Sequence, residues 1–211
     1  MTDCESCRQI FAEHENNDRL ADILEANHSG CACEQCTVGQ GSPGPVGEHE
    51  RSLRIIISPR DIDPASGTIF SPPFQKAFRN GVSVCRELAS DEDVVSLVRE
   101  GWNRSADADP KVLSVCRATA KDIRAIRNES YERVFCIYDQ TVARDDASQM
   151  PISTHAGIFG RYPPPKTADR KKIQKDFAGR LRELFIEGEI AIVQFREGLL
   201  TRIKLSERGG L

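Results

Sequence analysis

Cysteine spacing constrains this chain more than any other feature of its sequence. Five of the eight cysteines lie in the first 36 residues, where Cys4 and Cys7 form one CxxC pair and Cys33 and Cys36 form another. Zinc prefers a closed tetrahedral set of thiolate or imidazole ligands. Two CxxC pairs brought together by a helical excursion supply such a set. We therefore predict a structural zinc site formed by Cys4, Cys7, Cys33 and Cys36, with Cys31 and His28 as alternative ligands.

Two other interpretations of the N-terminal cysteines stay open, because the 25 residues between Cys7 and Cys33 exceed the common zinc spacing of about 15–20. The cysteines could be free thiols in a flexible tail, or they could hold an iron–sulfur cluster. The other three cysteines lie in apolar strand-like stretches and are expected to pack in the core as small hydrophobes. These are Cys85, Cys116 and Cys136.

The chain start and the apolar stretches bear on the expected compartment. Residues 1–5 show neither the basic region nor the apolar region of a secretory signal. No apolar stretch approaches the ~20 residues that a membrane helix needs. We therefore expect a cytoplasmic protein that has no membrane partner. In that compartment cysteines serve more often as thiols or metal ligands than as disulfides.

Charge is divided unevenly between the two parts of the chain. Residues 1–50 contain ten acidic and two basic residues, a net charge of −8, so residues 51–211 carry +5 within the total of −3. An acidic segment could bind a protein partner or dock on the basic body of the same chain. Two independently solvated surfaces are the alternative.

Composition and periodicity predict two folded parts joined by a linker. Residues 1–37 form the Cys-rich module, with a helix from about residue 5 that breaks near residues 16–17. Residues 38–50 are rich in glycine and proline and form the linker. Residues 51–211 form an α+β body with a mixed sheet and three or four helices. Its expected strands are residues 53–58, 82–86, 113–117, 133–138, 189–195 and 199–205.

Three features support these body elements. The strand Val82–Arg86 is echoed at Leu113–Arg117, and each copy is followed by a helix-capping signal. The best helical pattern follows Thr167, with an apolar stripe from Ile173 to Phe185. Its outer face is basic, so Lys171, Lys172 and Lys175 could bind nucleic acid. A solvated surface is the alternative.

Three residues in strand-like positions suggest an enzyme. Arg54 lies on an early strand and Ser83 on a middle strand, while Glu189 ends an E-x-E sequence at the start of a late strand. This order resembles that of the arginine–serine–glutamate ADP-ribosyltransferases. The resemblance implies that Arg54 and Ser83 organise an NAD site and that Glu189 assists the transfer. The sequence departs from the family at Val82-Ser83-Val84, where the family has a Ser-Thr-Ser motif.

His155 is a further catalytic candidate, because imidazole titrates near neutral pH and can act as a general base. A structural or surface histidine is the alternative. Asp61 and Asp63 could ligate a hard cation, but carboxylates in a proline-bounded stretch more often stabilise a turn. P-loop, dinucleotide-binding, zincin and nucleophile-elbow motifs are all missing from the sequence.

The sequence thus favours a cytoplasmic zinc-binding interaction or regulatory protein. The first alternative is an enzyme, in its sharpest form an NAD-using transferase similar to the ADP-ribosyltransferases. The second alternative is a nucleic-acid-associated protein that uses the basic helix. Convergence of Arg54, Ser83, His155 and Glu189 on one pocket would favour the enzyme.

Overall fold

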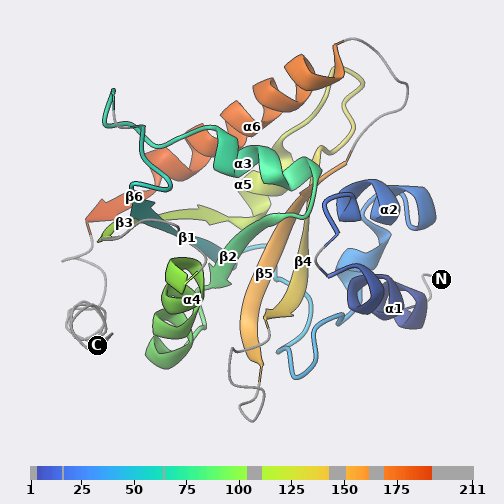
Figure 1. The fold of residues 1–211 in the computed structure, drawn as a ribbon. Helices are drawn as coiled ribbons and strands as arrows, with labels where there is room; N and C mark the ends of the chain where they lie inside the picture. The colour runs from blue at the N-terminus through green and yellow to red at the C-terminus, as the bar shows by residue number, and fades with distance from the viewer. Residues whose placement is uncertain are drawn as a thin grey trace.

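Six antiparallel strands form one sheet at the centre of the protein (Figure 1). The computed structural model describes residues 4–15, 17–63, 65–103, 111–142, 151–161 and 169–191. The strand order is β4-β5-β2-β1-β3-β6, and every pairing between these strands is antiparallel. The strands are β1 (Arg51–Ser58), β2 (Val82–Arg86), β3 (Lys111–Thr119), β4 (Phe135–Val142), β5 (Ile152–Gly160) and β6 (Glu189–Ala191).

Helices in the described residues confirm the predicted α+β class. Two helices precede the sheet and four belong to the body. They are α1 (Cys4–His14), α2 (Leu20–Asn27), α3 (Pro72–Gln75), α4 (Asp91–Asn103), α5 (Ala120–Ala125) and α6 (Arg170–Glu187). Short 3-10 turns, η1 (Ala32–Gln35) and η2 (Lys76–Phe78), complete the fold. No helix in the described ranges is both long enough and apolar enough to cross a membrane.

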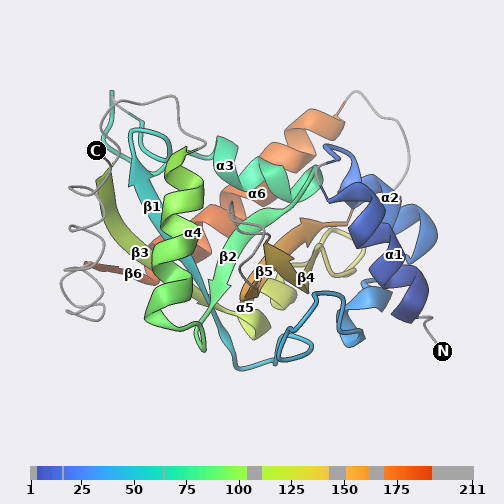
Figure 2. The ribbon, with the colours of Figure 1, turned by 60° about the horizontal axis from the view of Figure 1, so that its bottom comes forward.

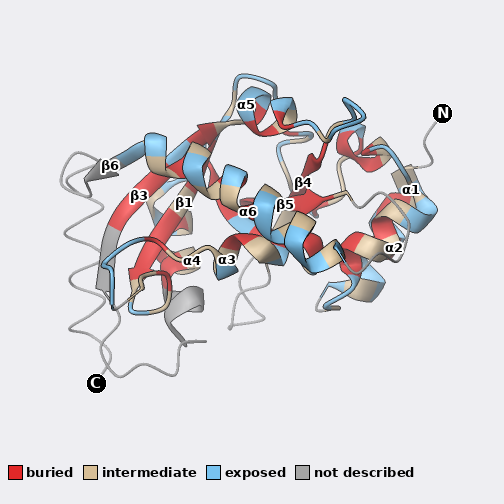
Figure 3. Cartoon of the chain, turned by 90° about the horizontal axis from the view of Figure 1, so that it is seen from above, coloured by how far each residue is buried: buried red, intermediate tan, exposed pale blue. Residues whose placement is uncertain are grey.

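One face of the sheet packs against α3, α5 and α6 (Figures 1 and 3). Because side chains alternate between the two faces of a strand, alternate residues of β2, β4 and β5 and one residue of β1 contribute to this core. Ile56, Val84, Ile137 and Ile158 are among its buried members. The α6 helix adds a buried stripe that includes Leu181 and Phe185, as its sequence pattern predicted.

The opposite face carries two separate apolar clusters. Figure 2 shows the helices that cover them, α4 over one and α1 and α2 over the other. In the first, α4 packs Val94 and Val98 against Leu53 and Ile55 of β1. In the second, α1 and α2 pack against β4 and β5. Its members include Phe11, Leu20, Leu24, Tyr138 and Phe159. Among the described residues, no helix covers the sheet between these two clusters.

Local sequence signals predicted most of these elements. Ser90 Oγ accepts a hydrogen bond from the Asp93 N–H at 3.1 Å at the start of α4. Thr119 Oγ1 accepts one from the Asp122 N–H at 3.1 Å at the start of α5. The repeated pattern of a strand followed by a capped helix is therefore confirmed. The predicted cap at Thr167 and the strand 199–205 lie outside the described residues.

The N-terminal segment (residues 4–36) differs from the expectation of thiols or metal ligands. Its five cysteines all form disulfides, two within the segment (Cys4–Cys36 and Cys7–Cys33) and one to the sheet (Cys31–Cys136). Cys136 is buried in an apolar cluster, as predicted, but its sulfur atom is bonded to Cys31. Its strand pattern gave the burial correctly but could not reveal a partner 105 residues away.

Candidate active site

A cleft opens where β1 and β2 separate. These strands pair only at Ser52–Arg86 and Leu53–Cys85, whereas β1 stays paired with β3 along its whole length. Beyond the paired residues, the Arg54 Nη1 group donates a 2.9 Å hydrogen bond to the Ser83 carbonyl oxygen. The Arg54 side chain therefore bridges the two strands in place of the backbone ladder.

The cleft has a volume of about 750 Å³, within the range of small-molecule sites. Its apolar wall comes from β1 and α4 and includes Ile55, Leu97 and Val98. Its polar wall comes from the turn after β1, from α3 and η2, and from β2, β4 and β5. The polar and charged lining residues are Glu15, Arg54, Arg60, Asp61, Gln75, Lys76, Arg79, Asn80, Ser83, Gln140, Thr141 and His155.

Ser83 and His155 form a close pair in the cleft. The Ser83 Oγ lies 2.6 Å from the His155 Nε2 atom, and the residues come from the neighbouring strands β2 and β5. Ser83 is exposed, whereas only 5% of the His155 surface is exposed. A hydroxyl within hydrogen-bond distance of an imidazole is the geometry by which a base activates a nucleophile.

Positive charge is concentrated beside this pair. Arg54, Arg60, Lys76 and Arg79 line the cleft, and Asp61 is the buried carboxylate among them. Burial lowers the pKa of the Lys76 ammonium, and the neighbouring Arg54 and Arg60 lower it further. Burial also lowers the pKa of Arg54, although the Asp61 carboxylate opposes this effect. Such a site favours a bound anion, which would offset the mutual repulsion of the cations.

Asp61 pairs with two of these cations, Arg54 of β1 and Arg60 of the turn that follows it. Its carboxylate accepts hydrogen bonds from the Ile57 N–H at 3.0 Å and the Arg60 Nη2 at 2.8 Å, and it pairs with Arg54 at 3.4 Å. Burial by itself would raise the pKa of Asp61, but Arg54 and Arg60 outweigh it and the pKa is lowered. Asp63 instead accepts a hydrogen bond from the Ala65 N–H in an exposed turn.

The structure brings together three of the four catalytic candidates. Arg54, Ser83 and His155 line one cleft, whereas Glu189 is exposed on β6, pairs with Cys116 of β3 and is not among the lining residues. Sequence reasoning missed Arg60, Lys76, Arg79 and Gln140. Nothing local marks them, because each is an ordinary polar residue of a turn, a short helix or a strand.

A second cluster of reactive side chains lies in the N-terminal segment. The donor atoms of Cys7, His28 and Cys33 lie within 4.8 Å of one another, so these residues could hold a metal ion. In the structure Cys7 and Cys33 are bonded to each other, and the His28 Nε2 lies 2.9 Å from the Ser6 Oγ. Disulfide formation and metal ligation use the same sulfur atoms and exclude each other.

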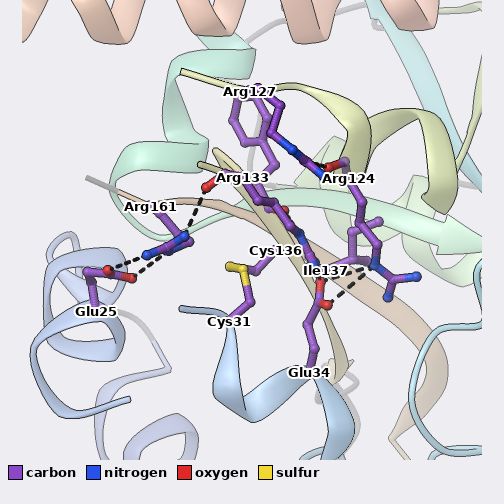
Figure 4. Close-up of a disulfide and its surroundings, with 10 residues drawn as sticks. Glu25, Cys31, Glu34, Arg124, Arg127, Arg133, Cys136, Ile137 and Arg161 are labelled. Carbon is purple, nitrogen blue, oxygen red and sulfur yellow. Dashed lines mark hydrogen bonds and ion pairs between the residues drawn. A yellow bond between two sulfur atoms is a disulfide. The ribbon is translucent and has the colours of Figure 1, made fainter. Parts of the chain in front are cut away.

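A disulfide, ion pairs and a hydrogen bond attach the N-terminal segment to the sheet (Figure 4). Beside the Cys31–Cys136 disulfide, the buried Glu34 carboxylate pairs with Arg124 and Arg133. The same carboxylate accepts a hydrogen bond from the Ile137 N–H of β4 at 2.5 Å. At the end of β5, Glu25 forms a two-pronged ion pair with Arg161 at 3.2 and 3.1 Å. These contacts connect the acidic segment to basic side chains of the body.

The fold and the cleft together define an α+β protein with an antiparallel six-stranded sheet and a cationic site containing a serine–histidine pair. In comparisons with known proteins, no family model, no curated protein and no solved structure matches the chain.

Proposed function

We propose that the protein is an enzyme that acts on a small phosphate-bearing substrate in the cleft between β1 and β2. The observation that carries this proposal is the arrangement of Arg54, Ser83 and His155, which come from three different strands and line one cleft. A volume of about 750 Å³ suits a ligand of nucleotide size. The cationic wall suits its phosphates, and the apolar wall of β1 and α4 suits its ring.

Six of the polar and charged lining residues have roles in this proposal. His155 is the general base that takes a proton from the Ser83 hydroxyl, and Ser83 is the candidate nucleophile. Arg60, Lys76 and Arg79 bind phosphate oxygens. Arg54 is a positioning residue, because its Nη1 group holds the Ser83 carbonyl oxygen and its Nη2 group faces Asp61.

The NAD-using transferase is the particular form of this proposal that the sequence resemblance implies. The position of Glu189 outside the cleft counts against it. Glu15 and Asp61 are the carboxylates at the cleft within the described residues, and Asp61 is already held by Arg54 and Arg60. NAD therefore belongs in the ligand panel as one member of the phosphate-bearing class.

Calorimetric titration of the full chain with inorganic pyrophosphate, ADP and NAD tests the proposal. We expect at least one ligand to bind, and Lys76→Ala and Arg79→Ala each to weaken it about tenfold, as expected for loss of a charge-assisted hydrogen bond. Ser83→Ala should retain binding and lose turnover of a substrate identified in this way. Failure of all phosphate ligands to bind would contradict the proposal.

The matched control removes the same charge as Lys76→Ala, but at lysines that lie outside the cleft. Lys171 and Lys172 are exposed on α6, so Lys171→Ala and Lys172→Ala should leave pyrophosphate affinity unchanged. The same two variants test the nucleic-acid alternative. That alternative requires salt-sensitive binding of a nucleic acid that weakens when these lysines are removed.

A second candidate function is favoured by the Cys7, His28 and Cys33 cluster. We propose that in a reduced, cytoplasmic chain these residues hold a structural zinc ion, with Cys4 or Cys36 as the fourth ligand. A zinc-stabilised acidic segment could then act as an interaction or regulatory element. The ion pairs of Glu25 and Glu34 with the body support its intramolecular docking rather than a separate partner.

Thiol counting and metal analysis separate the two states of this cluster. In a disulfide-bonded chain only Cys85 and Cys116 lie outside the disulfides, so two thiols react with a thiol reagent in denaturant. The zinc form predicts additional thiols and about one zinc ion per chain after purification under reducing conditions. A reduced protein that still lacks zinc after incubation with the metal would contradict the zinc proposal.

A further inference from the structure

We propose that the N-terminal segment inhibits substrate binding at the cleft and that its disulfides hold it in this inhibitory position. In this arrangement the acidic side chains Glu15 and Asp18 compete with the anionic substrate for the cationic wall. When no zinc ion is bound in their place, reduction of the disulfides loosens the segment and raises the affinity for the substrate. The inference rests on the proposed function of the cleft and adds its regulation.

The segment contacts the cleft at Arg79. Asp18, in the turn between α1 and α2, forms an ion pair with the Arg79 guanidinium. The Ala21 N–H donates a 2.8 Å hydrogen bond to the Arg79 carbonyl oxygen, so this part of α2 is fixed beside the same residue. Arg79 and Glu15 both line the cleft. A phosphate that binds Arg79 therefore competes with the Asp18 carboxylate, and Glu15 adds a second negative charge at the cleft.

The apolar contact beneath the segment also reaches the cleft. Phe11 of α1 packs edge-on against Phe159 of β5, with 5.9 Å between the ring centroids. Phe159 in turn fills the space beside Gly81, where a Cβ atom would lie 2.6 Å from the ring. Gly81 lines the cleft between Arg79 and Ser83. Phe159 therefore connects α1 to the backbone that carries the cleft residues.

Disulfides hold this arrangement together. Cys31–Cys136 fixes the segment to β4, while Cys4–Cys36 and Cys7–Cys33 fix its first helix to its last turn. Cys4 is partly exposed, whereas Cys7, Cys31, Cys33, Cys36 and Cys136 are buried. A reductant should therefore reach the Cys4–Cys36 disulfide first, because exchange requires access to a sulfur atom.

The redox step is a thiol–disulfide exchange. For each disulfide, a dithiol reductant supplies two electrons and two protons and becomes a disulfide itself, and the protein gains two thiols. Without these covalent links, the segment is held by the apolar cluster that includes Phe11, Leu20 and Leu24, by the buried Glu34 carboxylate and by exposed ion pairs. The exposed Asp18–Arg79 pair contributes little by itself. The reduced segment should therefore open more often and leave Arg79 to the substrate.

Calorimetric titration with inorganic pyrophosphate tests the inference on the full chain, oxidised and then reduced with dithiothreitol. Removal of one competing charge at contact distance predicts affinity about three- to fivefold tighter in the reduced protein. Asp18→Asn should produce the same gain in the oxidised protein, and reduction should then add little. Glu13→Gln is the matched control, because Glu13 belongs to the same segment and its carboxylate accepts a hydrogen bond from Gln9.

Equal affinity of the oxidised, reduced and Asp18→Asn proteins would overturn the inference while leaving the cleft an anion site. If reduction abolishes the near-ultraviolet dichroism of the whole protein, the oxidised Asp18→Asn variant decides alone, and unchanged affinity overturns the inference. An equal gain from Glu13→Gln would also overturn it, because the effect would then be general charge reduction. Absence of binding in every form would overturn both the inference and the proposed function.

Discussion

At the scale of single residues, Asp61 shows how the cleft is assembled from side chains that the sequence did not connect. The stretch around it was recognisable as a turn, since Pro59 and Pro64 enclose it. Its role depends on Arg54, seven residues earlier on β1, which the turn brings back beside it. Side chains of this kind can be predicted as turn formers, but not as partners of a strand arginine.

Replacement of Asp61 by asparagine should destabilise the protein. Asp61→Asn leaves the buried Arg54 guanidinium without its counter-charge, and breaking a buried pair typically costs about 3–5 kcal/mol. The pKa of Asp61 is lowered in the folded state, so its stabilising contribution is present above the unfolded pKa and is lost as pH falls through the folded value. Urea unfolding near neutral pH measures the effect.

Asp63→Asn is the matched control for this experiment, because Asp63 lies two residues away in an exposed turn. It should have a much smaller effect on the urea midpoint. Equal effects of the two substitutions would contradict the role assigned to Asp61. The prediction concerns folding and can fail independently of the proposed activity.

Lys76 gives the cleft a pH dependence of defined sign. Its pKa is lowered by burial and by Arg54 and Arg60, and a bound anion would raise it. Binding therefore takes up a proton, and affinity should fall as pH rises through the pKa of Lys76. Titration with ADP above about pH 8, where its phosphates are fully ionised, measures this directly. Lys76→Arg should remove the pH dependence of ADP affinity, because arginine stays charged. An unchanged pH profile in this variant would contradict the role of Lys76.

At the scale of elements, the sequence predicted individual strands and helices, but it did not predict how the strands pair in the sheet. Strand alternation and capping signals identified β2, β3, α4 and α5, since each depends on residues within one turn or strand. The separation of β1 from β2 was not predictable in this way, because it results from how two strands with good patterns pair with others. The cleft exists only through that separation.

Close packing around Gly157 in β5 leaves no space for a larger side chain. A Cβ atom on Gly157 would collide with the Gln140 side chain and lie 2.6 Å from the Phe159 ring. Gly157 also lies opposite Ser83 in the β2–β5 ladder. Gly157→Ala should therefore lower stability and disturb the Ser83–His155 pair, with a cost of about 1–3 kcal/mol for overpacking.

Gly179 is the control position, because alanine is expected to stabilise the protein there. It lies within α6, and a Cβ atom there would meet nothing within 4 Å. Gly179→Ala should raise stability by about 0.5–1 kcal/mol, because alanine loses less conformational freedom than glycine in a helix. Thermal unfolding of both variants measures the difference. Destabilisation by Gly179→Ala, or tolerance of Gly157→Ala, would contradict the packing described here.

At the scale of the whole molecule, the uneven charge of the sequence has a structural counterpart. The acidic N-terminal segment forms ion pairs with Arg79, Arg124, Arg133 and Arg161 of the body. Composition predicted that such docking was available, and it left two independent surfaces as the alternative. It could not predict which arginines take part, because these are positioned by β4, β5 and the chain that precedes each of them.

Covalent attachment of the N-terminal segment yields the last prediction. Cys31–Cys136 closes a loop with a sequence separation of 105, and a crosslink over about 100 residues stabilises by up to ~4.7 kcal/mol in the chain-entropy description. The double variant Cys31→Ser/Cys136→Ser should lower the free energy of unfolding by about 2–4 kcal/mol under non-reducing conditions. Cys85→Ala, at a buried cysteine that is not part of a disulfide, is the control. Urea unfolding with and without reductant separates the contribution of the Cys31–Cys136 disulfide from that of the two disulfides within the segment. The reductant should destabilise the control and affect the double variant less. Equal sensitivity of both proteins would mean that this crosslink does not fix the segment to the sheet.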